Sequence, residues 1–320
     1  MRPTIFHLLA ACLLAAPPPS RAQALKPVSI MLDWYPEAEA GGYYDAWVNG
    51  LYRRAGLDVT LLSASPNVTV EPQVALGKVD FGLSNSDKIL MARSHGIPLV
   101  AVMSSLQHDA SCILVHDASP VRTFSDLEGH AIAAQPGAPW LHYIIKKYGL
   151  RNLRVTPLTF DYANFLHDPG YIQQGFITAE PPIMKFHGVP VRYLWVRDSG
   201  CDPYMSLVTS DRFRTREPQA VRAFIRASID GWRDYLAHPA AADAEILRRN
   251  PAMSQVQLTL SRQVMIERRV VQGDRPGEDV GVIDPARFAN QYRILRDLGV
   301  IPQDFDFTAA YSLEYLPARQ

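Results

Sequence analysis

Residues 33–44 have the sequence DWYPEAEAGGYY and lie between an apolar run, residues 28–32, and a helical pattern that starts near Tyr43. The apolar run predicts a strand, so this stretch falls on the loop between the first strand and the first helix. Ligands of open α/β sheets bind at such loops, outside the carboxyl ends of the strands. Gly41 and Gly42 would let the backbone approach a ligand closely, and Trp34 offers a flat face to a ring. The alternative is a turn that packs Trp34 into the core.

The first 24 residues have the pattern of a secretory signal peptide. Arg2 precedes an apolar run over residues 5–16, and an A-x-A cleavage site ends at Ala24. A four-residue match to a lipoprotein acylation box ends at Cys12, but the apolar stretch before it is very short and the run continues past it. We therefore predict a periplasmic protein cleaved near Ala24 and without a lipid anchor. No later segment resembles a transmembrane span.

Charge and cysteine content exclude several classes of function. Removal of residues 1–24 leaves 30 basic and 32 acidic residues, a net charge of −2, which argues against nucleic acid as a partner. Cys112 and Cys201 are the cysteines of the mature chain. An oxidising compartment permits a disulfide between them, and separate buried thiols are the alternative. The chain has no Cys-x-x-Cys or His-x-x-x-His spacing, so we expect neither a dedicated zinc site nor a cofactor.

Strands and helices alternate through two successive blocks of the chain. Expected strands cover residues 28–32, 57–62, 79–83 and 99–105, then 113–115, 131–134, 155–160, 173–178 and 191–196, and finally 206–209. Expected helices of the C-terminal part cover residues 218–236, 240–249, 254–271 and 285–298. This alternation predicts α/β lobes with mostly parallel sheets flanked by helices. We assign residues 25–110 to lobe I, 111–205 to lobe II, and 206–320 to the return to lobe I.

Polar residues follow two of the expected strands. Residues 84–87, Ser-Asn-Ser-Asp, precede a helix, where they would cap it or face the same sheet edge as Trp34. Glu180 falls at a strand end, just before a helix whose first positions are proline. Its carboxylate would accept N–H donors from a ligand or pair with another loop, and the sequence leaves both open.

Motifs spread from about residue 28 to about residue 240 resemble a known family. They are LDWxP (32–36), GxYxA (42–46), GLDV (56–59), VAxGKxDFG (74–82), DLxG (126–129), GFITxEP (175–181) and DPY (202–204). Together they resemble the periplasmic solute-binding proteins of ABC importers. The branch includes binders of thiamine-pyrimidine precursors and, more distantly, of sulfonates and nitrate.

The resemblance implies a type II periplasmic binding protein, whose two lobes are joined by two hinge strands and close on a small molecule in a cleft. It implies a monomer that delivers its ligand to an ABC permease in the inner membrane. Carried over by position, the ligand-facing residues are Trp34, Tyr44, Asn85, Ser86, Gln107, Glu180, Asp202 and Tyr204.

One departure from the family pattern concerns the ligand. Pyrimidine-type members carry asparagine and histidine in the first loop, where this chain has Glu37 and Ala40. The precursor pyrimidine is therefore not the expected ligand. The retained aromatic residues Trp34 and Tyr44, with the carboxylates Glu39 and Glu180, suit a planar, nitrogen-rich or cationic heterocycle.

Two other functions compete with import. The fungal pyrimidine synthase has the same fold and needs a histidine on the first loop, a lysine and a cysteine-rich iron site, whereas this chain has Ala40 and two distant cysteines. A ligand-sensing periplasmic module would have an indistinguishable sequence. No nucleophile–base pair is visible, and although Glu39 and Glu180 could act as acid and base, we expect a protein that is not an enzyme.

Overall fold

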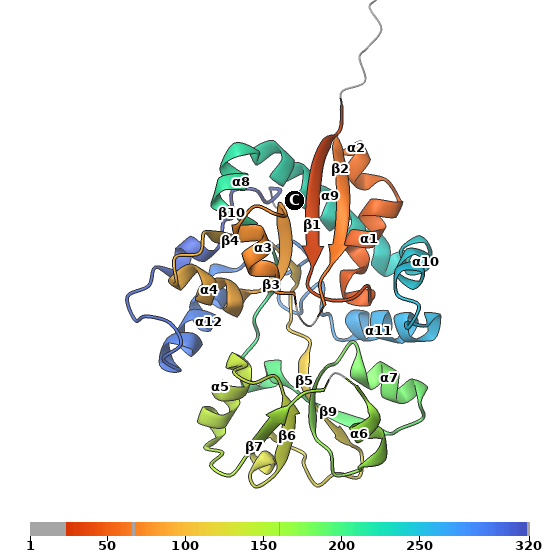
Figure 1. Cartoon of the computed structure of the whole chain (residues 1–320), viewed down its shortest axis with the longest axis vertical. Coiled ribbons are helices and arrows are strands. Elements are labelled where there is room, and N and C mark those ends of the chain that lie inside the picture. The colour runs from red at the N-terminus through yellow and green to blue at the C-terminus, as the bar shows by residue number, and fades with distance from the viewer. Residues whose placement is uncertain (1–23, 66–67, 160, 319–320) are drawn as a thin grey trace, which may run out of the picture.

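The computed structural model describes residues 24–65, 68–159 and 161–318. In these ranges the chain forms two lobes, each built on a five-stranded sheet (Figure 1). The predicted signal peptide up to residue 23, with Cys12, lies outside the described residues. None of the described helices combines the length and apolar character that a membrane span requires.

Lobe I contains both ends of the described chain. Its strands are β1 (Lys26–Leu32), β2 (Leu57–Ser63), β3 (Phe81–Asn85), β4 (Leu99–Leu106) and β10 (Met205–Ser210), in the order β2-β1-β3-β10-β4. Its helices are η1 (Ala38–Ala40), α1 (Gly41–Val48), α2 (Leu51–Arg54), α3 (Val70–Ala75), α4 (Ser86–Ser94), α8 (Asp211–Arg216), α9 (Pro218–Ala237), α10 (Ala240–Arg249), α11 (Gln255–Glu267), α12 (Pro285–Asp297) and η4 (Phe307–Ala310).

Lobe II is formed by the middle of the chain. Its strands are β5 (Ser111–His116), β6 (Ala131–Ala134), β7 (Arg154–Pro157), β8 (Gln173–Phe176) and β9 (Val191–Trp195), in the order β7-β6-β8-β5-β9. Its helices are η2 (Phe124–Leu127), α5 (Pro139–Tyr148), α6 (Ala163–His167), α7 (Glu180–Phe186) and η3 (Val196–Ser199).

The two sheets share one topology. In lobe I, β1 pairs in parallel with β2 and β3, while β10 pairs antiparallel with β3 and β4. In lobe II, β6 pairs in parallel with β7 and β8, while β5 pairs antiparallel with β8 and β9. Four strands of each sheet therefore share a direction and one opposes them. The opposing strands, β5 and β10, are the ones that follow the crossovers between lobes, residues 107–110 and 200–204. The predicted two-lobe, mostly parallel fold is confirmed.

Helix α9 organises the core of lobe I. Its apolar stripe is buried at Val221, Phe224, Ile225 and Trp232, at the spacing that the sequence predicts for a helix face. The rings of Tyr52 and Phe81 stack on Phe224 at centroid distances of 4.7 and 4.4 Å. Strand β4 is buried along its whole length, as expected for a strand covered on both faces.

The paired glycines of the first loop serve helix packing. Gly41 and Gly42 begin α1, and a Cβ atom at Gly42 would lie 2.2 Å from the Trp232 ring of α9. Across the contact, a Cβ atom at Gly231 would lie 2.4 Å from the Gly42 carbonyl oxygen. The prediction that these glycines bring backbone next to a ligand is wrong, because the space they leave is filled by α9.

Two further sequence-based expectations differ from the structure, and one alternative that the sequence left open is decided. Helix α11 ends at Glu267, four residues before the predicted end at residue 271, and Arg269 then adopts a left-handed conformation with φ 52°. Strand β7 ends at Pro157, three residues before the predicted end. Cys112 and Cys201 are both buried free thiols, so the disulfide that the sequence left open is not formed.

The close contact between α1 and α9 predicts a large effect of one methyl group. Gly42→Ala should lower the free energy of unfolding by about 1–3 kcal/mol, because the added Cβ atom must displace the Trp232 ring. Urea unfolding would measure the change. Gly170→Ala is the matched control, since that glycine is exposed and its nearest neighbour is a carboxylate oxygen at 3.3 Å. Equal stability of the Gly42 variant and the unsubstituted protein would contradict this account of the contact.

Candidate functional site

The loop after β1 carries three acidic side chains and one indole. Asp33, Trp34, Glu37 and Glu39 are half-buried, and the Trp34 ring meets Tyr35 edge-on at a centroid distance of 5.3 Å. The loop is held from outside by Asn250 of lobe I, whose amide donates to the Pro36 carbonyl at 2.9 Å. The predicted loop therefore has a fixed position at the carboxyl end of β1.

Glu180 approaches from lobe II, at the first residue of α7. Its Oε2 accepts a 2.6 Å hydrogen bond from the backbone N–H of Phe176, and the turn between them is tight because Gly175 has no side chain. A Cβ atom at Gly175 would lie 3.0 Å from that carboxylate oxygen. Prolines at the first positions of α7 suit a helix start, where backbone donors have no partner within the helix.

The two lobes touch beside these residues. The buried Thr178 hydroxyl of lobe II donates a hydrogen bond to the Glu39 carboxylate of lobe I. Ile177 and Trp195 of lobe II belong to the same apolar cluster as the core of lobe I. Helix α7 also packs against α11, on the right of Figure 1. The structure is therefore of the lobes in contact.

Asp33, Glu37, Glu39 and Glu180, the interlobe carboxylates, act as one electrostatic group. Burial raises the pKa of Asp33 to about 6, of Glu180 to about 7 and of Glu37 to about 8. Burial and then the other three carboxylates raise the pKa of Glu39 well above its ordinary value. Lys88 acts on Asp33 in the opposite sense. Within the described chain, no cation is among the groups that shift the pKa of the three glutamates, and Lys88 acts on the cluster through Asp33.

Asp109 on the first crossover is a site residue that sequence reasoning missed. It is 5% exposed, and burial raises its pKa to about 7. Its Oδ2 accepts from the Asn85 amide at 2.9 Å and its Oδ1 from the Ser111 N–H at 2.7 Å. Asp109 is also one of the charges that raise the pKa of Glu39. The available signal was its position on the crossover, two residues before β5.

Asn85 and Ser86 do not cap α4 through their side chains. Asn85 precedes the helix but makes no capping bond, and its amide is directed to Asp109. The Ser86 hydroxyl accepts from the Tyr204 N–H at 3.0 Å and is buried. Asn85 thus lies beside the acidic group, whereas Ser86 joins α4 to the second crossover.

Tyr44 and Gln107 lie inside the protein rather than on a surface that a ligand reaches. Tyr44 is 0% exposed and is covered by the Arg249 guanidinium, 5.6 Å from its ring. The Gln107 amide donates to the backbone carbonyls of Asp279 at 2.6 Å and Val282 at 2.9 Å. Both positions were expected to face the ligand, and in this structure packing occupies them instead.

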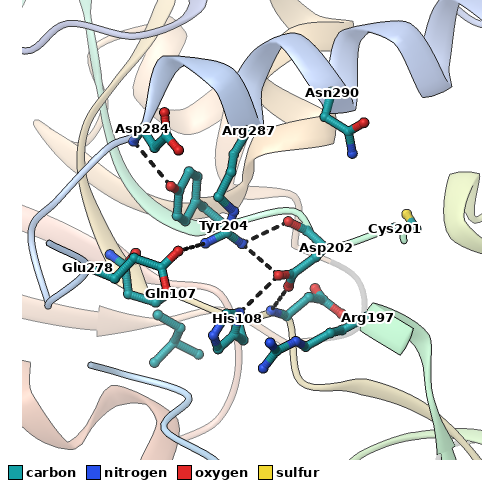
Figure 2. Close-up of polar contacts among 12 residues, drawn as sticks. Gln107, His108, Arg197, Cys201, Asp202, Tyr204, Glu278, Asp284, Arg287 and Asn290 are labelled. Carbon is teal, nitrogen blue, oxygen red and sulfur yellow. Dashed lines mark hydrogen bonds and ion pairs between the residues drawn. The ribbon is translucent and has the colours of Figure 1, made fainter. Parts of the chain in front are cut away.

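Asp202 and Tyr204 anchor the second crossover, as Figure 2 shows. Asp202 accepts hydrogen bonds at 2.9 Å from His108 Nδ1 and from the Asp109 N–H, and pairs with Arg287 of α12 at 2.9 Å. The Arg287 guanidinium lies 3.8 Å over the buried Tyr204 ring. The geometry therefore shows these two residues joining both crossovers to lobe I, and the ligand contact expected of them stays a prediction.

One group of side chains has a metal-like spacing. Ligand atoms of His108, Asp274 and Glu278 lie within 4.8 Å of one another. Arginines already pair with both carboxylates, since Arg197 binds Asp274 and Arg275 binds Glu278 at 2.5 Å. A cation would have to displace these partners, so the arrangement is that of an ion-pair network.

Two surface grooves lie away from the interlobe carboxylates. One, of about 550 Å³, runs between α2 and α9 and includes Arg54, Arg222 and Arg226. The other, of about 270 Å³, lies between the end of α9 and residues 271–280. None of the four carboxylates lines either groove.

Comparison with known proteins identifies the family. A family described as NMT1/THI5 like matches residues 37–242, and the chain belongs to it. The riboflavin-binding protein RibY of Chloroflexus aurantiacus is 24% identical over 314 residues, covering 95% of this chain and 90% of the relative. The formylaminopyrimidine-binding protein of Halalkalibacterium halodurans is 27% identical over 236 residues, 69% of each chain.

A 4-amino-5-hydroxymethyl-2-methylpyrimidine phosphate synthase of Candida albicans is also a relative, 27% identical over 256 residues that cover 71% of this chain and 72% of the synthase. Among solved structures, the periplasmic aliphatic sulphonate binding protein SsuA of Escherichia coli superposes with a TM-score of 0.69 at 16% identity. The match covers 90% of this chain and 97% of that protein, and it shows a shared fold.

The raised pKa values predict how the stability of the ligand-free protein depends on pH. Carboxylates of the unfolded chain titrate near pH 4, so between about pH 5 and pH 8 the folded state binds more protons than the unfolded state. Stability should therefore fall as the pH rises through this range. Thermal unfolding at pH 5 and pH 8 would measure it.

A matched pair of variants tests whether the interlobe carboxylates cause the pH dependence of stability. Glu37→Gln should reduce the pH dependence, whereas Glu267→Gln, which alters an exposed carboxylate of α11, should leave it unchanged. A protein that gains stability from pH 5 to pH 8 would contradict the electrostatic description.

Proposed function

We propose that this protein is the substrate-binding component of an ABC importer. It captures a small planar nitrogen heterocycle, cationic or rich in N–H donors, when its lobes close. It acts as a monomer in the periplasm and passes the ligand to a permease of the inner membrane. The observation that carries the proposal is the meeting of acidic side chains from both lobes, Glu37 and Glu39 with Glu180, with no cation of the described chain among the groups that shift their pKa.

The chemistry of the group supports a positively charged or donor-rich ligand. Buried carboxylates that repel one another are unfavourable as anions, and a cation or several N–H donors between them removes that cost. An anion such as a sulfonate would add to the repulsion. Trp34, half-buried on the same loop, supplies a face for stacking a ring.

The relatives support the same class of ligand. The names of RibY and of the formylaminopyrimidine-binding protein both denote binding of a planar nitrogen heterocycle. This chain differs at Glu37 and Ala40 from the pyrimidine-type pattern, so we propose a different heterocycle from the thiamine precursor. The ligand contacts that we propose are Trp34, Glu39, Asn85 and Glu180, with Asp109 added.

A synthase or a sensor has less support. The synthase chemistry needs a histidine on the first loop, where Ala40 is buried against the core, and cysteines for iron, whereas both described thiols are buried and free. A sensor would use the same lobe closure, and permease and ATPase genes beside the coding sequence would favour import instead.

Isothermal titration tests the ligand class. We expect heat of binding from heterocycles such as thiamine, riboflavin or 4-aminopyridine, and none from benzenesulfonate. For a ligand that binds, Glu180→Gln should weaken affinity roughly tenfold to a hundredfold, through loss of a charged hydrogen bond. Trp34→Ala should weaken it by about twofold to tenfold, through loss of stacking. Glu128→Gln, on the exposed surface of lobe II, is the control. Binding of anions alone would refute the proposal.

Proton release gives a second, independent test. Because burial raises the pKa of Glu37 to about 8 and of Glu180 to about 7, these groups hold protons near neutral pH. A cation favours their ionised form, so binding should release protons and strengthen from pH 5 to pH 8. Titration in two buffers of different ionisation enthalpy measures the number released. Proton uptake on binding would contradict the assignment.

A further inference from the structure

The segment between α11 and α12, residues 268–283, crosses the hinge, and we call it the strap. The Val270 carbonyl accepts from the backbone N–H groups of Gln107 and His108 at 2.7 and 3.0 Å. Gly281 forms a β-bridge with Ser104 of β4. The strap is thus fixed both to the first crossover and to the sheet of lobe I.

The strap is held in a tight, specific turn. Arg269 enters it with φ 52°, a conformation that costs a non-glycine residue energy and must be maintained by its surroundings. The Glu278 carboxylate accepts from the N–H groups of Asp274 and Arg275, both at 3.0 Å. Gly273 has φ 74°, and a Cβ atom there would lie 2.4 Å from Glu278. These constraints set the position of the Asp274 side chain.

Asp274 reaches from the strap to lobe II. Its carboxylate pairs with Arg197 of η3, and its Oδ1 lies 3.4 Å from His108 Nε2. Figure 2 shows Arg197 near His108 and Asp202, where the crossovers meet. Arg197 also lies 4.8 Å over the Trp195 ring of β9. The Arg197–Asp274 pair is therefore a bond between lobes, located at the hinge rather than at the interlobe carboxylates.

A second contact joins the strap to the same strand of lobe II. The Arg268 guanidinium lies 5.9 Å from the Tyr193 ring of β9. Movement of lobe II away from lobe I would separate both arginine contacts, whereas the bonds from Val270 to the crossover lie within lobe I and the hinge. The strap thus makes two kinds of contact: those of Val270 and Gly281, which stay with lobe I and the first crossover, and those of Arg268 and Asp274, which can break when lobe II moves.

We propose that the strap is a latch that sets the balance between open and closed lobes, with the Arg197–Asp274 ion pair as its releasable bond. The proposal rests on the lobe closure of the proposed function. The Arg197 and Asp274 side chains are 22% and 37% exposed, and solvent weakens such an ion pair. The pair therefore shifts the equilibrium between open and closed lobes modestly and does not hold the lobes closed permanently. Ligand affinity then depends on the fraction of closed protein that the latch provides.

Charge reversal in the ligand-free, full-length protein tests the latch. Fluorophores on Leu76→Cys and Phe186→Cys, both exposed, report the distance between lobes by energy transfer, and the native thiols are buried. Arg197→Glu should shift molecules to the longer distance. Addition of Asp274→Arg to that variant should restore the shorter distance. Arg197→Ala should change the ratio of closed to open molecules by roughly twofold to fivefold.

The control is Arg192→Glu, which reverses the charge of an arginine whose partner, Asp117, lies in the same lobe. It should leave the distance unchanged, and thermal unfolding checks that each variant is folded. A folded Arg197→Glu protein with an unaltered distance distribution would overturn the latch, as would a swapped pair that opens like the single variant. The readout needs no ligand, so failure of heterocycle binding would refute the ligand class and leave the latch standing.

Discussion

The structure depends on a conflict between burial and charge where the two lobes touch. Asp33, Glu37 and Glu39 come from one lobe and Glu180 from the other, and burial is the largest cause of the raised pKa in each. Such a group lowers stability unless it is protonated or paired. Binding sites often contain such unfavourable groups of buried like charges, because a bound ligand can provide the compensating charge or hydrogen-bond donors. The Thr178–Glu39 hydrogen bond shows that lobe closure already brings one neutral donor to the group.

At the hinge, in contrast, the charged side chains are paired with partners of opposite charge. Asp202 receives donors from both residues 108 and 109 and from Arg287, so one carboxylate binds both crossovers to α12. The strap adds bonds to the first crossover through Val270 and Gln107. Among the described residues, no cation shifts the pKa of the three glutamates between the lobes, whereas arginines gather a short way along the crossovers. In our proposals, ligand capture belongs to the first of these regions and control of lobe movement to the second.

Much of the fold could be predicted from the sequence, and less of the site. Hydrophobic periodicity located α9 closely, the bounds expected for α10 match, and the apolar run at residues 28–32 located β1. Trp34, Glu39 and Glu180 were placed on facing loops, and the structure brings the two glutamates into one group. Tyr44 and Gln107 were assigned to the ligand because their positions follow the right elements. Sequence position does not reveal direction, and their side chains point into packing contacts.

By itself, the sequence determined the order of strands and helices, the two-block repetition and the family, since these follow from local periodicity and from motifs that each lie within one segment. The tertiary structure alone decided that Gly41 and Gly42 serve the α1–α9 contact, and that Asp109 joins the acidic group. It also decided that Asp202 binds the hinge together. Each of these depends on which residues from distant segments become neighbours. Burial and the electrostatic effect of nearby charges depend on residues that are distant in the sequence. The sequence pattern therefore indicates candidate residues, and their roles follow only from the packed structure.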